Sequence, residues 1–480
     1  MQIPLLEYTK KGMTNEDTIC AISTPSGVGG IAVIRVSGPE SIDIADSIWK
    51  GARLADVPSH TVHLGTIIDD TSGCKEPLDQ AVATIFRSPH SYTGENVVEF
   101  SVHGSKYVQR QLINLLINHG CRLAEAGEFT RRAFSAGQID LAQAEGVADV
   151  IASTSRSAHR LAVSQMRGDF SSKLAGLRER LLELSALLEL ELDFSEEDVE
   201  FASRKHLLEL AEEAHGTVTR LASTFSRGVA IRDGIPVAII GRTNTGKSTL
   251  LNTLLHDDRA IVSEIHGTTR DIVEDTIDIG GTLFRIIDTA GLRDTSDEVE
   301  SIGIDRALER ASRAKIILWM TDATDTCDSI RESYSRMSSC LSEGQDMIAV
   351  VNKIDAISDP KKLEEIDQTI SGLHPDATMI HISAKNGHGL TDLSSSLVEY
   401  AHGNESDESD IIVTNARHYQ ALKLASDSLS HTIDGLHIGL SGDFIAQDLR
   451  ETLHHLGSIT GTITTPDILS TIFTRFCVGK

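Results

Sequence analysis

The feature that most constrains this chain is a glycine-rich loop between an apolar strand and the start of a helix. The string PVAIIGRTNTGKSTLLN (236–252) places Gly241, four further residues, and then Gly246, Lys247 and Ser248 directly after an apolar run. Glycines let backbone N–H groups close around phosphates at a helix N-terminus. Lys247 supplies a positive charge for the β- and γ-phosphates, and Ser248 offers a hydroxyl to Mg²⁺. The pattern predicts a phosphate-binding loop.

Four further motifs follow in a fixed order and indicate which nucleotide binds. They are GTTRD (267–271), RIIDTAGLR (285–293), AVVNKID (349–355) and ISAK (382–385). A switch loop can bring Thr269 to Mg²⁺ and the γ-phosphate, Asp288 is an acid at a strand end, and Gly291 is placed to contact the γ-phosphate. The Asp355 carboxylate can accept from N1–H and N2–H of guanine, and the N–H of Ala384 can donate to the guanine carbonyl. The motifs together predict a guanine-specific P-loop GTPase domain.

Two residues bear on how such a domain would hydrolyse its nucleotide. Leu292 follows DTAG, where Ras-type enzymes carry a glutamine that orients water, so the catalytic device must come from elsewhere. Asn244 precedes Gly246 by two residues, and its amide oxygen could coordinate a monovalent cation that stabilises developing charge. From the residue alone, a loop-shaping hydrogen bonder is the favoured interpretation. Both interpretations stay open.

Composition limits the remaining possibilities. The 480 residues allow two to four domains, and 40% hydrophobic with 24% charged residues is ordinary for globular protein. No apolar run approaches the roughly 18 residues of a membrane-spanning helix, and the N-terminus lacks a signal-peptide layout, so a cytoplasmic protein is predicted. Six dispersed cysteines without a CxxC pair favour reduced thiols. The net charge of −26 argues against broad non-specific binding to nucleic acid.

The order of composition along the chain predicts a multidomain α/β plus α protein. Short strands ending at Gly or Pro are expected in the first part, namely IAVIRVSGP (31–39), AVATIFRSP (81–89) and NVVEFSVHG (96–104), with a helix over 106–120. Leucines from Leu174 to Leu192 recur at steps of three and four, which predicts a long amphipathic helix. The predicted domains are an α+β domain (1–129), a helical domain in two parts (130–228 and 401–480) and, inserted between them, the GTPase domain (229–400).

The whole chain resembles the tRNA-modifying GTPase family MnmE, also called TrmE. The strings that carry the resemblance are TPSGVGGIAVIRVSG (24–38), SYTGENVVE (91–99), AGEFTRRAFSAGQIDLAQAEGVADVI (126–151), DTAGLRDTSDEVESIGI (288–304) and the terminal FCVGK (476–480). The resemblance implies a homodimer that works with tRNA and the FAD-containing protein MnmG, in a heterotetramer. It further implies that a one-carbon unit of 5-formyl- or methylene-tetrahydrofolate helps to build an aminomethyl or carboxymethylaminomethyl group at C5 of the wobble uridine (position 34).

The family also implies potassium-dependent hydrolysis. Carried over by position, the K⁺ ligands fall on Asn244, Ser263, Thr268 and the backbone of Ile265, and Glu300 falls where a carboxylate helps to orient the attacking water. Thr243 stands where the family often has Pro. The full GTP-binding set is predicted as Asn244, Thr245, Gly246, Lys247, Ser248, Thr249, Ser263, Glu264, Ile265, His266, Gly267, Thr268, Thr269, Asp288, Thr289, Ala290, Gly291, Asn352, Lys353, Asp355, Ser383, Ala384 and Lys385, with Mg²⁺ on Ser248 and Thr269.

The resemblance places tetrahydrofolate contacts at both ends of the chain. They fall on Arg35, Glu99 and Lys480, and on Gln138, which stands where the family often carries Lys. Cys477 is fourth from the end, but the final Lys and the absence of a basic cluster make prenylation a poor fit. Residues alone favour a half-buried structural cysteine, whereas the resemblance places it near the modification chemistry. The predicted catalytic residues are therefore Glu300, Lys247, Thr269 and Cys477.

One alternative of another class is a ribosome-assembly or regulatory GTPase that binds RNA through a separate module. Such proteins often carry a KH domain, whose GxxG loop clamps the RNA backbone. The string GLSG (439–442) is a match, but it lies between helical stretches. We therefore expect it to be an interhelical turn.

Overall fold

The computed structural model describes residues 17–71, 75–193, 204–256, 275–287, 314–338, 341, 344–357, 359–402, 411–474, 476 and 479. The chain divides into two compact units. The first comprises residues 1–148, 165–176 and 453–480, and the second comprises residues 149–164 and 177–452. Each unit is built from segments that are distant in the sequence.

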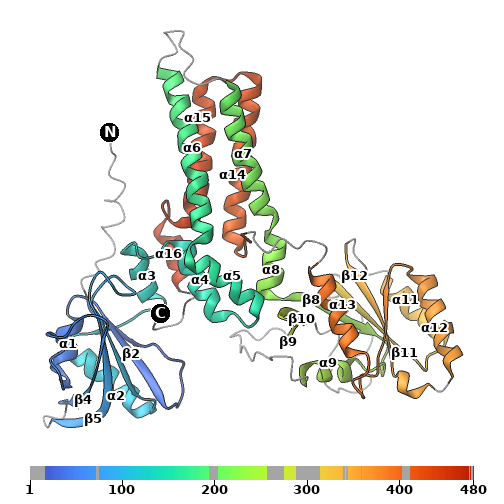
Figure 1. Cartoon of the computed structure of the whole chain (residues 1–480), viewed down its shortest axis with the longest axis horizontal. Coiled ribbons are helices and arrows are strands. Elements are labelled where there is room, and N and C mark those ends of the chain that lie inside the picture. The colour runs from blue at the N-terminus through green and yellow to red at the C-terminus, as the bar shows by residue number, and fades with distance from the viewer. Residues whose placement is uncertain are drawn as a thin grey trace. The chain divides into compact units, whose positions relative to one another are not determined.

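The described residues of the first unit contain a seven-stranded sheet in the order β3-β4-β5-β6-β2-β1-β7 (Figure 1). Its strands are β1 (Ile19–Ile22), β2 (Ile31–Ser37), β3 (Trp49–Lys50), β4 (Thr61–Asp69), β5 (Glu76–Phe86), β6 (Val97–His103) and β7 (Arg122–Leu123). All neighbours are antiparallel except β1 and β7. The three predicted strands correspond to β2, β5 and β6, and the predicted helix is α2 (Lys106–Asn118).

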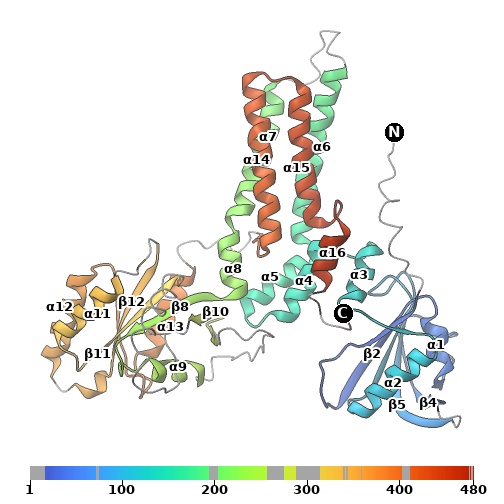
Figure 2. The same ribbon diagram turned by 180° about the vertical axis from the view of Figure 1, so that it is seen from behind.

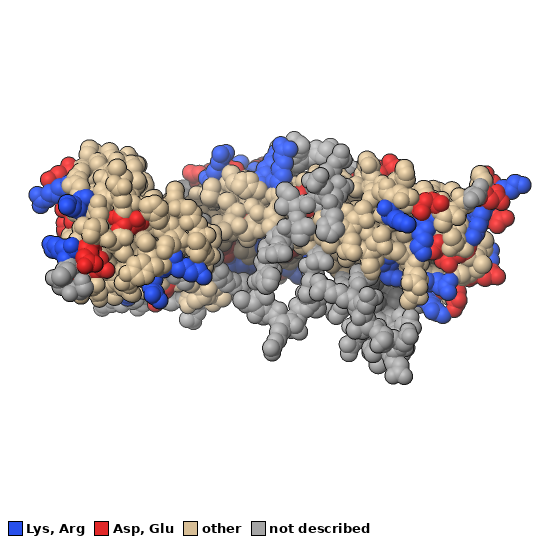
Figure 3. Space-filling model, turned by 90° about the horizontal axis from the view of Figure 1, so that it is seen from below, with Lys and Arg blue, Asp and Glu red and all other residues tan. Residues whose placement is uncertain are grey.

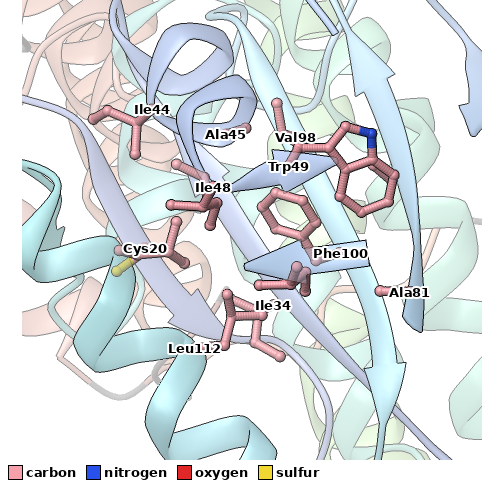
Figure 4. Close-up of a cluster of buried hydrophobic side chains, with 14 of the residues drawn as sticks. Cys20, Ile34, Ile44, Ala45, Ile48, Trp49, Ala81, Val98, Phe100 and Leu112 are labelled. Carbon is pink, nitrogen blue, oxygen red and sulfur yellow. The ribbon is translucent and has the colours of Figure 1, made fainter. Parts of the chain in front are cut away.

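One face of this sheet is covered by helices α1 (Ser41–Ser47) and α2. Side chains on alternate positions of β2 and β6, such as Ile34 and Phe100, point into the same core, as period-two alternation requires (Figure 4). Trp49 packs against Phe100 with ring centroids 5.8 Å apart. Burial of these residues fixes the register of β2 against β6, because a slip of one residue would turn every core side chain outward.

The end of the chain packs against residues more than 300 positions earlier. Leu141 and Ala144 of α4 (Leu141–Ala152) share a core with Phe473 of α16 (Pro466–Phe473) and with Phe476. Helix α3 (Glu128–Ser135) precedes α4. Helix α16 is thereby held against α4, in the same unit as the α+β domain.

The helical part contains α5 (Arg156–Arg167), α6 (Asp169–Asp193), α7 (Arg204–Ser223), α8 (Phe225–Asp233), α14 (Ala416–Ile438) and α15 (Gly442–Thr460). Five of the predicted leucines of α6 are at most 5% exposed, namely Leu174, Leu177, Leu181, Leu184 and Leu188. Helices α7 and α14 lie side by side in both views (Figures 1 and 2). GLSG joins α14 to α15, so the prediction of an interhelical turn is confirmed.

Contacts around the inserted segment show that the two helical blocks form one structure. Phe225 stacks on Tyr419 with ring centroids 4.5 Å apart, and the N–H of Val413 donates to Thr224 Oγ1 at 3.0 Å. Arg232 donates to the carbonyl of Thr414 at 2.8 Å. The chain therefore leaves the helical block after α8 and returns to the same place before α14, as the prediction of an inserted domain requires.

The inserted domain is an α/β structure around a sheet whose described strands have the order β13-β12-β11-β8-β10-β9. They are β8 (Ile235–Gly241), β9 (Asp275–Ile279), β10 (Thr282–Ile287), β11 (Ile316–Asp322), β12 (Asp346–Asn352) and β13 (Thr378–His381), and all pairs except β9–β10 are parallel. Helices α9 (Lys247–His256) and α13 (Leu390–His402) pack on one face, and α11 (Cys327–Ser338) and α12 (Pro360–Leu373) on the other. The predicted fold class is confirmed.

Within the part of the chain that the structure describes, no helix is both long and apolar enough to cross a membrane. Cys20 and Cys121 are buried free thiols, and Cys327 is partly exposed. The predicted domain bounds stay a prediction, and α8 continues across the predicted boundary at residue 228 to Asp233.

Candidate functional site

The phosphate-binding loop leaves β8 at Gly241 and enters α9 at Lys247, which is the predicted strand–loop–helix arrangement. Gly246 has φ +96°, which disfavours any residue with a side chain. A Cβ atom there would lie 2.2 Å from Nδ2 of Asn352. The loop therefore needs glycine both for its backbone angle and for the close approach of the guanine-recognition motif. Ser248 and Thr249 lie in the first turn of α9, at the positive end of its dipole.

Lys247 lies within the loop that it serves. Its Nζ donates to the carbonyl oxygens of Gly241 at 2.8 Å and Arg242 at 2.7 Å. Burial lowers the pKa of Lys247, since the charged ammonium loses solvation. Both bonds are to backbone atoms of the loop, so the loop conformation and the position of the ammonium group depend on each other.

Asn352 joins three predicted motifs. Its Nδ2 donates to the carbonyl of Thr245 in the phosphate loop at 2.8 Å, and its Oδ1 accepts from the N–H of Ala384 at 2.9 Å. Asn352 is 2% exposed, so both bonds are shielded from water. The N–H of Ala384, predicted to meet the guanine carbonyl, is engaged with Asn352 here, and its role toward guanine stays a prediction.

The Asp355 carboxylate is oriented by the neighbouring motif. Ser383 Oγ donates to Asp355 Oδ1 at 2.6 Å, and Ser383 is fully buried. One oxygen of the carboxylate is thus fixed by the ISAK segment, which itself follows β13. Because carboxyl ends of parallel strands meet at one sheet edge, motifs that are 28 residues apart in the chain come together here.

Lys353 makes two contacts that sequence reasoning missed. Its Nζ lies 2.6 Å from Asp322 Oδ2 and donates to the carbonyl of Asn244 at 2.6 Å. Burial of Asp322 opposes ionisation, but the hydrogen bond from Lys353 and those from Thr324 outweigh it and lower the pKa of Asp322. Asp322 ends β11 beside the other motif strands, and an acid at such a strand end is the signal that could have found it.

Asn244 combines features of both interpretations that its sequence position allows. Its backbone has φ +64°, a left-handed conformation that Asn tolerates better than most residues. Its side chain is exposed and makes no hydrogen bond to another described residue. The backbone thus shapes the loop, while the amide oxygen is available to a ligand.

A second polar cluster lies on the α+β domain. Arg35 of β2 and Glu99 of β6 are direct cross-strand partners, and their Nε and Oε1 atoms are 2.8 Å apart. The rings of Tyr92 and Phe129 each have their centroid 5.4 Å from the guanidinium carbon of Arg35. A planar cation beside two aromatic rings and a carboxylate suits a flat polar ring with an acidic tail. Tyr92 and Phe129 stand inside motifs that carry the family resemblance, but nothing in the sequence indicated that they touch Arg35.

A buried cluster of charged side chains lies beside this second site. The sequence did not indicate it. Arg132 Nη2 lies 2.8 Å from Asp17 Oδ1 and 3.1 Å from Glu128 Oε1. Arg132 Nη1 lies 3.2 Å from Glu95. Burial of Glu128 opposes ionisation, but hydrogen bonds from Arg122, from the N–H of Glu125 and from Arg132 outweigh it, so the pKa of Glu128 is lowered. The cluster ties α3, which carries Phe129, to the loops around it.

The other predicted folate positions lie around the same sheet. Gln138 is exposed, and its side chain lies beside Gly94 of the SYTGEN loop. Near the C-terminus, the carbonyl of Gly479 accepts from Ser23 Oγ at 3.1 Å. Gly479 has φ +98°, and a Cβ there would lie 2.2 Å from the carbonyl of Ile22. The end of the chain thus runs beside β1, the neighbour of the strand that carries Arg35.

Several predicted residues lie outside the described residues, so their placement is not tested. They are Ser263, Glu264, Ile265, His266, Gly267, Thr268, Thr269, Asp288, Thr289, Ala290, Gly291, Leu292, Glu300, Cys477 and Lys480.

Comparison with known proteins identifies the family. Residues 18–138 match the family model for the GTP-binding protein TrmE N-terminus, and residues 141–477 match that for the MnmE helical domain. The tRNA modification GTPases MnmE of Bacteroides fragilis and Bacteroides thetaiotaomicron are each 48% identical over 471 residues, covering 97% of this chain and 100% of those proteins. That of Christiangramia forsetii is 45% identical over 483 residues, covering 98% and 100%. The chain therefore belongs to the MnmE family of tRNA modification GTPases.

Proposed function

We propose that this chain is the GTP-hydrolysing subunit of a complex that modifies C5 of the wobble uridine, position 34, in certain tRNAs. The observation that carries the proposal is the bridge made by Asn352 between the phosphate loop and the ISAK segment. It joins the phosphate-recognition and guanine-recognition motifs in one site, in a chain whose relatives of matching length are tRNA modification GTPases.

The described residues divide the work of binding GTP. Lys247 places its charge at the phosphates, and Asp355, oriented by Ser383, selects guanine by accepting two N–H groups that adenine lacks. Ser248, at the helix N-terminus, and Thr269 would hold Mg²⁺, which neutralises phosphate charge when bound. An oxygen ligand in the first turn of α9 fits that hard cation.

We assign potassium dependence to Asn244, with Ser263, Thr268 and the Ile265 backbone as further ligands. The exposed Asn244 side chain without a described partner supports this, because an amide oxygen is a suitable ligand for a monovalent cation. The cation would stabilise charge that develops on the phosphates. Glu300 would orient the attacking water in place of the missing glutamine, and Thr269 would complete the catalytic loop.

We further assign tetrahydrofolate, as its 5-formyl or methylene form, to the Arg35–Glu99 cluster. Arg35 would pair with the acidic tail of the folate, Glu99 would accept from the amine groups of the pterin, and Tyr92 and Phe129 give a planar apolar lining. Gln138 and Lys480 would complete the site. Cys477 precedes Lys480 by three residues in the sequence and would lie close to the folate. The folate supplies the one-carbon unit for an aminomethyl or carboxymethylaminomethyl group.

The proposed assembly is a cytoplasmic homodimer through the N-terminal domain, joined by the FAD-containing protein MnmG as a heterotetramer and acting on tRNA. On the face of the seven-stranded sheet opposite α1 and α2, β4 presents the exposed side chains of Val62 and Leu64, and these apolar side chains support such pairing.

The test is complementation of a strain that lacks the gene, with nucleoside mass spectrometry of wobble uridines. The unsubstituted chain should restore modification, and the Lys247→Ala variant should not. Lys361→Ala, at an exposed position on α12, is the matched control and should restore it fully. Modified uridine at the parental level without the gene, or with Lys247→Ala, would refute the proposal. Co-purification with ribosomal particles rather than with an FAD protein would favour the ribosome-assembly alternative.

A further inference from the structure

Helix α5 differs in charge from the rest of this acidic chain. Residues 150–168 carry Arg156, Arg160 and Arg167 but no Asp or Glu, whereas the whole chain has a net charge of −26. The nearest acids in sequence are Asp149 and Asp169, one on each side of that stretch. Such a stretch is where an acidic protein could still attract a polyanion.

The three arginines share one face of the helix. Positions four and eleven residues beyond Arg156 lie within about 40° of it on a helix with 3.6 residues per turn. All three side chains are exposed. The buried positions of α5, Ala158, Ala162 and Gln165, fall on the opposite side of the helix. We call Arg156, Arg160 and Arg167 the arginine face of α5.

The chemistry of this face suits phosphate. Its three cations are all Arg, whose planar guanidinium can bind phosphate oxygens through two parallel hydrogen bonds. Among the described residues, no ion pair joins Arg156 or Arg167 to a carboxylate. The face extends over roughly 16 Å at 1.5 Å per residue, long enough to meet several successive backbone phosphates.

On the face of the molecule drawn in Figure 3, Lys and Arg lie in small groups, many of them beside Asp or Glu, and wide areas carry neither. Any attraction for RNA on a chain of this charge must therefore be local.

We propose that the arginine face of α5 binds the phosphate backbone of tRNA. The inference rests on the proposed function and adds to it a contact surface for the nucleic acid. Because the contacts are to phosphates, they position the tRNA without reading its sequence.

The experiment measures binding of an unmodified tRNA transcript to the full chain by fluorescence anisotropy, between about 50 and 200 mM potassium salt. Replacing all three arginines by Gln should weaken binding at least about tenfold at the low-salt end. It should also make the slope of log affinity against log salt shallower by about two to three, since each lost phosphate contact removes close to one. The Arg→Lys triple variant should keep most of the parental slope, because it keeps the charges.

The matched control removes three exposed cations elsewhere, by Arg331→Gln, Arg336→Gln and Lys361→Gln on α11 and α12. It has the same net charge as the Gln triple variant and should bind tRNA as the parent does. Both Gln triple variants, on α5 and on α11 and α12, should keep the parental rate of GTP hydrolysis and the parental circular dichroism spectrum. The inference is overturned if the parent does not bind tRNA, or if the Gln triple variant keeps the parental affinity and slope. It is also overturned if the Gln triple variant still binds tRNA but no longer binds the FAD protein. That last result would assign the arginine face to an acidic protein surface.

Complementation separates the two levels of failure. If the unsubstituted chain restores wobble-uridine modification while the Gln triple variant still binds tRNA normally, only the arginine face is refuted. If the unsubstituted chain fails to restore modification, the proposed function itself is refuted.

Discussion

The two candidate sites are built in different ways. In the inserted domain, functional groups stand at the ends of β8, β11, β12 and β13 or in the loops that follow them, and all of them meet at one edge of a parallel sheet. In the α+β domain, Arg35 and Glu99 stand within strands and meet across an antiparallel pair, 64 residues apart in the chain. The first site is an edge of loops, and the second is a patch on a sheet face.

The groups that support the two sites differ as well. Around the nucleotide site, side chains such as Asn352 and Lys247 bond to backbone carbonyls, so the loops hold one another. Beneath the second site, the side chains of Glu128 and Arg132 form a buried ion cluster with their neighbours. A buried ion pair becomes strongly destabilising when one member is removed, because the other charge is left without a partner. The two sites should therefore fail in different ways.

The largest effect is expected from Glu128→Gln. It removes the most buried of the three carboxylates around Arg132, leaving Asp17 and Glu95, and should destabilise the α+β domain by about 3 kcal/mol, the lower end for a broken buried ion pair. The chain has two tryptophans, Trp49 in this domain and Trp319 in the inserted one, so a Trp319→Phe background lets fluorescence follow the first alone during urea unfolding. The matched control is Glu125→Gln, whose side chain is 65% exposed and should change stability by less than about 0.5 kcal/mol. Equal midpoints for the two variants would contradict this account.

The same pair of proteins gives a pH prediction. The pKa of Glu128 in the folded chain is lowered from the ordinary 4.5, so its stabilisation is fully present above that value and is lost as the pH falls below it. The difference in urea midpoint between the parent and Glu128→Gln should therefore be constant near neutral pH and shrink in acid. A difference that grows as the pH falls would mean that the sign is wrong. The Glu125→Gln midpoint should follow the parent throughout.

The next largest effect is expected from Gly246→Ala. Its Cβ would collide with Asn352 at 2.2 Å on a backbone of φ +96°, so the bridge between the phosphate loop and the base motif must move. GTP affinity, measured by titration with a fluorescent analogue, should fall about 100-fold, as it does when about 2.7 kcal/mol is lost. Gly216→Ala is the control, since a Cβ there meets nothing within 4 Å in the middle of α7, and GTP affinity should not change. Folate binding should be unaffected in both variants. A parental GTP affinity in Gly246→Ala would show that GTP binding does not depend on the bridge.

These differences explain how much of each site could be predicted from sequence. The nucleotide motifs are local strings in which strand, turn and functional group are contiguous, so Lys247, Asn352 and Asp355 could be identified and ordered without a fold. Parallel strands then bring them to one edge as a rule of the architecture. The inserted position of the domain could be predicted too, because helical composition resumed after it.

The sheet site shows what sequence could not give. The resemblance supplied Arg35 and Glu99, but their mutual contact depends on the register of β2 against β6, which burial of the opposite face decides. Tyr92 and Phe129 reach Arg35 only through the folding of loops. The ion cluster of Glu128 and Arg132 was invisible for a related reason, because charged residues on a short helix ordinarily face solvent. Side-chain partners from distant segments are set by tertiary packing, which leaves no local pattern.

A smaller effect is expected from Arg35→Gln. It removes the charge beside the two rings and the pairing with Glu99, and calorimetry should show affinity for 5-formyl-tetrahydrofolate about tenfold weaker, the size of one lost charge-assisted hydrogen bond. Arg53→Gln, in the same domain with a side chain 71% exposed, should bind as the parent does. GTP affinity should stay parental in both, which is the reverse of the pattern for Gly246→Ala. Loss of both ligands in Arg35→Gln would show a folding defect rather than a lost contact.

The smallest effect is expected at Asn244, and it separates the two roles that its conformation allows. Hydrolysis by the parent should be faster in potassium than in sodium, and Asn244→Ala should bring the two rates together, lowering the potassium rate about fivefold for the loss of one ligand. Asn244→Gly is the decisive partner, because glycine keeps the left-handed backbone of φ +64° and removes only the amide. If the glycine variant behaves like the alanine variant, the side chain binds the cation. If it keeps the parental preference for potassium, Asn244 only shapes the loop. Thr243→Ala, at the neighbouring exposed position, should keep the parental ratio of rates.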